Sequence, residues 1–133
     1  MGGDHVILDT NVLIRLEREL KKRESGSVVR FLENLPQGRI CITPTIAGEF
    51  CSGISMAERK IWDDALAPYE MLKITPESAW IYGAIYRDLA KRGELIGTND
   101  MWIAATALTH GLPVATGNVR EFERVDGLVV VPV

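Results

Sequence analysis

The chain has 133 residues, of which 47% are hydrophobic and 25% charged, as is typical of one globular domain with a sizeable core. The net charge of −3 argues against a protein that coats nucleic acid through a broad basic surface, but it is compatible with an enzyme that gathers acids around metal ions. No apolar run approaches the ~20 residues of a membrane span, and no signal peptide is evident, so we expect a cytoplasmic protein. Cys41 and Cys51 are too few for a disulfide scaffold, and with His5 and His110 they show no zinc-ligand spacing. We treat residues 1–133 as a single domain.

Short apolar runs alternate with amphipathic segments along the chain, which predicts strands separated by helices. Residues 5–9 predict a buried strand, and residues 10–22 predict a helix with Leu13, Leu16 and Leu20 turned inward. The later segments predict, in order, a helix at 27–35, a strand at 39–43, a helix from 44 to near 53, a helix at 56–66, a strand at 69–74, helices at 76–92 and 99–110, a strand at 113–116, a short helix or turn at 118–125 and a strand at 127–131.

Cap and turn residues mark the ends of several of these segments. Thr43 and Thr75 each precede a proline, a favoured N-cap followed by proline at the first helical position. Gly93 and Gly111 follow two predicted helices and are typical helix stops. The segment 36–38, Pro-Gln-Gly, predicts a turn. In the longest predicted helix the positions expected to face the core are Ile81, Ala84, Ile85 and Leu89.

This alternation predicts the fold class. Parallel strands need crossover connections, which place helices on both faces of the sheet. We therefore expect a three-layer α/β/α sandwich with a parallel sheet of four to five strands. In such sheets the active cleft lies at the carboxyl ends of the strands, where Asp9 and Thr116 follow the first and fourth predicted strands.

Three carboxylates stand at the boundary between the predicted core and the predicted helices. Asp9 is explained equally well as an N-cap, Glu49 as an exposed glutamate at the edge of an apolar helix face, and Asp100 as a stabiliser of a helix N-terminus. The three acids together are better evidence for a functional site than each one alone, because all three can approach the same edge of one sheet. Clustered carboxylates repel one another unless a cation neutralises them, and oxygen-only ligands favour Mg²⁺ or Mn²⁺.

Four segments carry these acids and a late threonine in a fixed order over nearly the whole chain. They are ILDTNVLI with Asp9, TPTIAGEF with Glu49, IGTNDMWIAATAL with Asp100, and VATGNVREFERVDGLVVV with Thr116. This series resembles the motifs of PIN-domain ribonucleases, and the chain is most similar to VapC-type toxins of toxin–antitoxin modules. The resemblance implies a PIN-like fold and an endoribonuclease, dependent on Mg²⁺ or Mn²⁺, that cleaves structured RNA such as tRNA or rRNA. It also implies a homodimer and a cognate antitoxin that covers the active groove.

The resemblance also assigns roles to individual residues. Asp9, Glu49 and Asp100 would hold the metal, with Asp9 supported by Thr10 and Asn11. Thr116 would orient water or an acid at the site. The chain departs from the family at Asn118, where many members have aspartate, and this leaves open whether one or two metal ions bind.

Two acids near Asn118 could be considered as its replacement. Glu121 lies one helical turn beyond Asn118 and could supply the missing charge, but a surface glutamate beside Phe122 is the simpler interpretation. Asp126 is best explained by the Asp-Gly turn that it begins.

Basic and aromatic side chains suggest further surfaces. On a helix Arg15, Arg18 and Lys22 share a face, which is either solvated or in contact with RNA phosphates. Tyr82 and Tyr86 also share a face, which suits either core packing or a dimer or antitoxin surface. Trp80 lies on the same predicted helix, and the expected structural tryptophans are Trp62 and Trp102.

Other functions fit the motifs less well. A dehalogenase-like enzyme would need an acid at Asn11, and a receiver domain would need paired acids in the first loop and a lysine after a late strand. A flap nuclease would need further loops, and a metal-free mechanism would need histidines beside the motifs. The remaining alternative is a PIN-like module that binds RNA or protein without cutting, and Asn118 slightly favours it.

Overall fold

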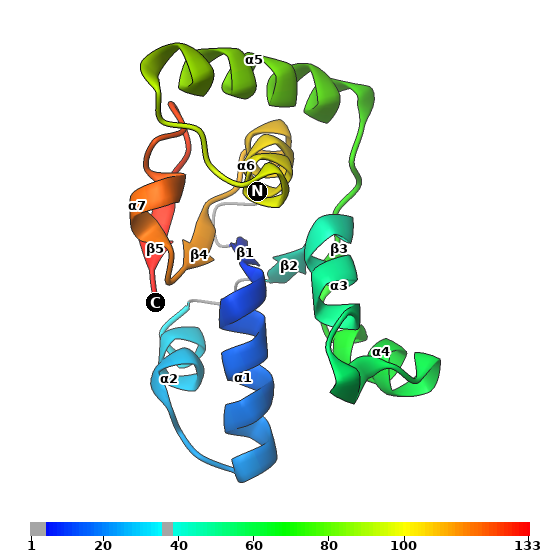
Figure 1. Ribbon diagram of the computed structural model, residues 1–133. Coiled ribbons are helices and arrows are strands. Elements are labelled where there is room, and N and C mark those ends of the chain that lie inside the picture. The colour runs from blue at the N-terminus through cyan, green and yellow to red at the C-terminus, as the bar shows by residue number, and fades with distance from the viewer. Residues whose placement is uncertain (1–4, 36–38) are drawn as a thin grey trace.

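Five parallel strands form one sheet, in the order β3-β2-β1-β4-β5, in the computed structural model, which describes residues 5–35 and 39–133 (Figure 1). β1 is central, and its Ile7 lies opposite Cys41 of β2 and Val114 of β4. The predicted parallel sheet is therefore confirmed, although β3 is shorter than expected. The strands are β1 Val6–Leu8, β2 Ile40–Ile42, β3 Glu70–Met71, β4 Val114–Thr116 and β5 Val130–Pro132.

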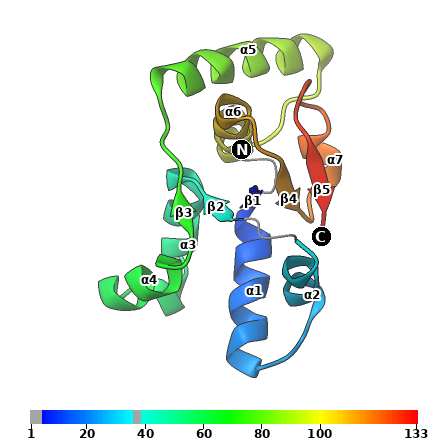
Figure 2. The same ribbon diagram turned by 180° about the vertical axis from the view of Figure 1, so that it is seen from behind.

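Helices cover both faces of this sheet, as Figures 1 and 2 show from opposite sides. Side chains alternate along β1, so Ile7 packs in the larger core with residues of α3, α5 and α6, whereas Val6 and Leu8 pack with α1 and α2. None of the described helices is long and apolar enough to cross a membrane. The helices are α1 Thr10–Lys22, α2 Ser27–Glu33, α3 Pro44–Cys51, the 3₁₀ turn η1 Ile54–Met56, α4 Arg59–Leu66, α5 Pro76–Arg92, α6 Thr98–His110 and α7 Val119–Phe122.

The predicted cap residues lie at the starts and ends of the helices as expected. The Thr43 hydroxyl accepts the Ile46 N–H at 3.2 Å, and Thr75 and Ser78 cap one another reciprocally at the start of α5. Gly93 and Gly111 adopt the left-handed backbone conformation, with φ of 68° and 67°, that ends α5 and α6. The turn predicted at 36–38 lies outside the described residues.

Three expectations about the helices are wrong. Leu20 is 55% exposed, because the last turns of α1 extend beyond the sheet and have no apolar layer to contact (Figure 1). Ala84 is exposed as well, on a face of α5 that the core does not reach. The helix expected at 56–66 ends at Leu66 as predicted but begins only at Arg59, and Met56 belongs to the preceding turn η1.

The contrast along α1 predicts different costs for two identical substitutions. Leu16 is 3% exposed, so Leu16→Ala should lower the free energy of unfolding by about 2–4 kcal/mol through lost burial and a residual cavity. Leu20→Ala in the same helix should change it by less than about 0.5 kcal/mol. Urea unfolding of the two variants measures the difference, and equal losses would show that the assigned burial is wrong.

Candidate active site

Asp9 lies at the end of the first strand, in the interior of the molecule. Asp9 follows β1 directly, is only 4% exposed, and caps α1 by accepting the Thr10 N–H on Oδ1 at 2.8 Å. Its other oxygen, Oδ2, accepts the hydroxyl of Thr116 at 2.7 Å. Burial raises the pKa of Asp9, these two hydrogen bonds oppose the rise, and the charge of Glu49 adds to it. The N-cap interpretation is correct for one carboxylate oxygen, but it does not account for the buried carboxylate as a whole.

Thr116 links Asp9 to the loop after β4. The residue is fully buried, and its Oγ1 donates to Asp9 while accepting the Asn118 N–H at 2.8 Å. Thr116 therefore orients an acid, which is one of its two predicted roles. Asn118 is the N-cap residue of α7 but makes no side-chain cap bond.

Glu49 on α3 is held by two other elements of the fold. The Thr10 hydroxyl donates to Glu49 Oε1, and the Asn99 amide donates to Oε2 at 3.1 Å. Glu49 is therefore half-buried and fixed, so the interpretation of it as an exposed glutamate is wrong. Thr10 thus supports Asp9 through its backbone and Glu49 through its hydroxyl, whereas Asn11 is exposed.

The contact made by Asn99 was not predicted from the sequence. Neither Thr98 nor Asn99 caps α6, because the N-cap residue is Gly97, without a side-chain cap bond. The Asn99 amide is therefore free to reach Glu49. The signal available in the sequence was the position of Asn99 directly before the third acid.

Asp100 lies in the first turn of α6 among other acids. Its pKa is raised to about 6, mainly by burial, and to a smaller extent by the charges of Asp9, Glu121 and Glu49 and by a hydrogen bond to Glu121. Glu121 on α7 thus belongs to the site, and its interpretation as a surface glutamate is wrong. Its place one turn after Asn118, on the same side of the helix, was the available signal.

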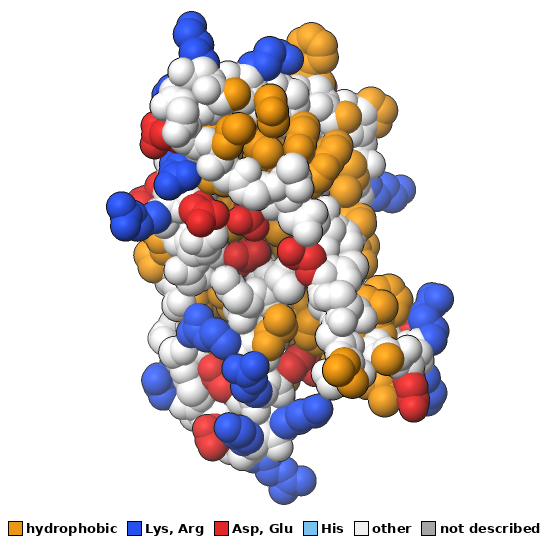
Figure 3. Space-filling view, in the orientation of Figure 1, with side chains coloured by type: hydrophobic (Ala, Val, Ile, Leu, Met, Phe, Trp, Pro, Cys, Tyr) orange, Lys and Arg blue, Asp and Glu red, His pale blue; other side chains and the backbone are white. Residues whose placement is uncertain are grey.

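The donor set suits a hard divalent cation. Asp9, Glu49 and Glu121, each from a different element, lie close enough to Asp100 to raise its pKa, and neither histidine nor cysteine is among these four residues. Figure 3 shows acidic side chains gathered in the middle of this face, between apolar side chains over α5 and α6 and basic ones over the far end of α1. Within residues 5–35 and 39–133, no group of three or more acidic, histidine or cysteine side chains is placed closely enough to hold a metal ion as it stands. The hydroxyls of Thr10 and Thr116 and the amide of Asn99 instead occupy oxygens of Asp9 and Glu49.

A groove of about 340 Å³ runs from Glu49 along α1. Arg18 and Lys21 line it, together with an apolar floor that includes Phe50 and Met56. The other two expected RNA contacts are placed differently. Arg15 donates to the Val133 carbonyl at 3.0 Å and to the Ser27 hydroxyl at 2.7 Å, and Lys22 is exposed outside the groove.

The aromatic residues of α5 divide between packing and exposure. Tyr82 stacks on Trp102 of α6 with ring centroids 4.3 Å apart, so it packs between these helices. Trp80 is 71% exposed and Tyr86 is exposed too, so core packing is wrong for both. Trp62 donates its indole N–H to the Ala47 carbonyl at 3.1 Å, which fits its expected structural role.

Known proteins are similar to this chain in both sequence and fold. A family model for the PIN domain matches residues 6–128. Ribonuclease VapC2 of Haemophilus influenzae is 35% identical over 127 residues, which cover 92% of each chain. The chain belongs to the VapC ribonucleases of the PIN-domain family. The tRNA(fMet)-specific endonuclease VapC of Shigella flexneri is 34% identical over 127 residues, again 92% of each chain. Among solved structures, DNA-bound VapBC from Salmonella typhimurium has a TM-score of 0.78 at 28% identity, covering 96% of this chain and 97% of that one.

Membership of the VapC family confirms both the fold class and the resemblance inferred from the four motifs. The VapC relatives span the same length of chain as this protein, so the four carboxylates lie within the region that the family shares.

In this VapC-family protein Thr116→Val should lower both the rate of RNA cleavage and the stability of the fold. The change removes the donor to Asp9 and the acceptor of the Asn118 N–H while keeping the side-chain shape. We expect a loss of about 1–2 kcal/mol in the free energy of unfolding and about tenfold in RNA cleavage. Thr106→Val, equally buried on α6, is the control that should retain cleavage. Full cleavage by Thr116→Val would show that Asp9 does not need this hydroxyl.

Proposed function

We propose that this protein is an endoribonuclease, dependent on Mg²⁺ or Mn²⁺, that cleaves structured RNA such as tRNA or rRNA and is held inactive by a cognate antitoxin. The observation that carries the proposal is the convergence of Asp9, Glu49, Asp100 and Glu121 at the carboxyl edge of the sheet. The relatives named as ribonucleases, one of them specific for tRNA(fMet), support the same reaction class.

The four acids and the residues that contact them would have different roles in binding the metal ion. Asp9 and Asp100 would hold the ion most directly, with Glu49 and Glu121 binding it or its water ligands, because Mg²⁺ commonly keeps several waters. When bound, such an ion activates water for attack on phosphorus and neutralises charge on the phosphodiester. Thr116 keeps Asp9 in place, and Glu121 supplies the negative charge that Asn118 lacks.

The surrounding surface suggests how substrate and partners would be bound. Arg18 and Lys21 lie along the groove that leads to Glu49, where they would contact RNA phosphates. The apolar floor at Phe50 and Met56 would receive an amphipathic segment of the antitoxin. Exposed Trp80 and Tyr86 on α5 favour a homodimer, since exposed aromatic side chains are typical of interfaces. We propose one PIN domain over residues 1–133, acting in the cytoplasm.

A cleavage assay tests this function. Purified protein is incubated with total tRNA and with rRNA, with Mg²⁺ or Mn²⁺ and with excess chelator. We expect discrete fragments that need the added ion and disappear with chelator, and their ends would identify the target. Intact RNA at high concentrations of folded protein would contradict the proposal and favour the non-cleaving binding module.

A further inference from the structure

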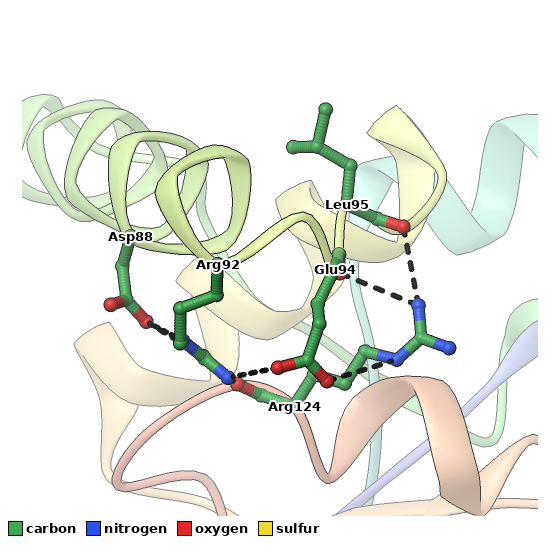
Figure 4. A network of polar contacts seen from close by, with 5 residues as sticks. All are labelled: Asp88, Arg92, Glu94, Leu95 and Arg124. Carbon is green, nitrogen blue, oxygen red and sulfur yellow. Dashed lines mark hydrogen bonds and ion pairs between the residues drawn. The ribbon is translucent and has the colours of Figure 1, made fainter.

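Two arginines connect the end of α5, residues 94–95 and the segment that follows α7 (Figure 4). Arg92, at the end of α5, donates to Asp88 at 2.7 Å, to Glu94 at 2.9 Å and to the main-chain carbonyl of Arg124 at 2.6 Å. Arg124 donates in return to the carbonyls of Glu94 at 3.4 Å and Leu95 at 3.2 Å. We call this set of contacts the Arg92–Arg124 clamp.

The clamp joins the two segments that carry Asp100 and Glu121. On one side, residues 94–95 lead into α6, whose first turn holds Asp100. On the other side, the backbone N–H of Arg124 donates to the Glu121 carbonyl at 3.1 Å, so Arg124 continues directly from the turn that holds Glu121. Because α7 has only four residues, it cannot maintain its own position, and tertiary contacts must supply it.

Apolar burial alone does not fix the orientation of α7. Phe122 and Val125 are buried and hold this segment against the core, but apolar contacts are non-directional. The planar guanidinium of Arg124 donates in fixed directions, here to two main-chain carbonyls. The clamp therefore adds the directional contacts that would set how α7 lies relative to the start of α6.

We propose that Arg124 is a positioning residue that holds α7 against the segment leading into α6, so that Glu121 faces Asp100 and both can serve one divalent ion. Arg92 supports this arrangement by binding the Arg124 carbonyl and Glu94. The role rests on the proposed metal-dependent function.

Binding of Mn²⁺ alone, measured by electron paramagnetic resonance of the free ion, tests this role. Arg124→Gln should weaken Mn²⁺ binding about tenfold, and it should lower kcat for RNA cleavage with little change in KM. In a protein that already carries Glu121→Gln, Arg124→Gln should lower the Mn²⁺ affinity by less than about a further twofold. The reason is that a positioning residue acts through the residue that it positions. Arg124→Lys should recover only part of the affinity, since it keeps the charge without the planar fork.

The control is Arg59→Gln on α4, which removes an arginine whose carboxylate partner, Asp63, lies on the same helix and not on a segment of the site. It should bind Mn²⁺ and cleave RNA like the wild type. The role of Arg124 would be overturned if Arg124→Gln bound Mn²⁺ with wild-type affinity. It would also be overturned if Arg124→Gln lowered the affinity by the same factor in the Glu121→Gln protein as in the wild type. If Arg124→Gln does not fold, full affinity and kcat in Arg124→Lys would overturn it equally. A wild-type protein that neither binds Mn²⁺ nor cleaves RNA would overturn the proposed function and this role with it.

Discussion

Asp9→Asn should reduce RNA cleavage by about 10³-fold while the protein remains folded. Asp9 is the most deeply buried of the four acids, and it lies where β1, α1 and β4 meet. Asparagine keeps an oxygen for the Thr10 N–H but brings no negative charge to the ion. Because burial raises the pKa of Asp9, the ionised side chain opposes folding at neutral pH, so its neutral replacement should cost less than about 1 kcal/mol in stability.

The matched control for Asp9→Asn is Asp64→Asn. Asp64 is an exposed acid on α4 that pairs with Lys60 at 3.2 Å, away from the other carboxylates. It should cleave RNA at the wild-type rate in the same assay, with thermal unfolding recorded for both variants. If Asp9→Asn kept more than a tenth of the wild-type activity, the assignment of Asp9 as a metal ligand would be wrong.

Asp100→Asn should lower cleavage by about 10²–10³-fold and yet make the metal-free protein more stable. The folded-state pKa of Asp100 is about 6, above the ordinary 3.8, so between these values the folded protein binds more protons than the unfolded chain. Its contribution to stability is therefore fully retained below pH 3.8 and lost as the pH rises through 6. At pH 8 the variant should gain about 1–2 kcal/mol, after allowance for the partial exposure of Asp100.

Urea unfolding in excess chelator from pH 4 to pH 8 measures this effect. The difference between Asp100→Asn and wild type should be close to zero at pH 4 and should reach its full size above pH 6. Asp126→Asn, which changes an exposed acid in the turn after α7, is the control variant in the same series. If Asp100→Asn were less stable than wild type at pH 8, ionised Asp100 would not be destabilising in the folded protein.

The central part of the fold and three of the four acids were predictable from local patterns. Val6 to Leu8 form a continuous apolar run that ends in Asp9, and this pattern alone indicates a buried strand followed by a helix start. Parallel topology then brings the residues after neighbouring strands to one edge, which places Thr116 beside Asp9.

What could not be predicted depends on tertiary placement. The spacing of Glu121 one turn after Asn118 was a signal, but in a helix of four residues it does not decide between the site and the surface, and the contact with Asp100 does. Asn99 reaches Glu49 across fifty positions of sequence, a contact that no local pattern reports. Leu20 continues the apolar spacing of α1, but helical periodicity does not show where the opposing layer ends.

Diffraction from crystals soaked in Mn²⁺, recorded at the manganese absorption edge, tests the metal centre most directly. We expect an anomalous peak among Asp9, Glu49, Asp100 and Glu121, with at least one carboxylate oxygen at about 2.0–2.3 Å from the ion. The peak should be absent in Asp9→Asn crystals soaked in the same way. No peak at this edge of the sheet in wild-type crystals, with Asp9 still bound to Thr116 and Glu49 to Thr10, would contradict the account.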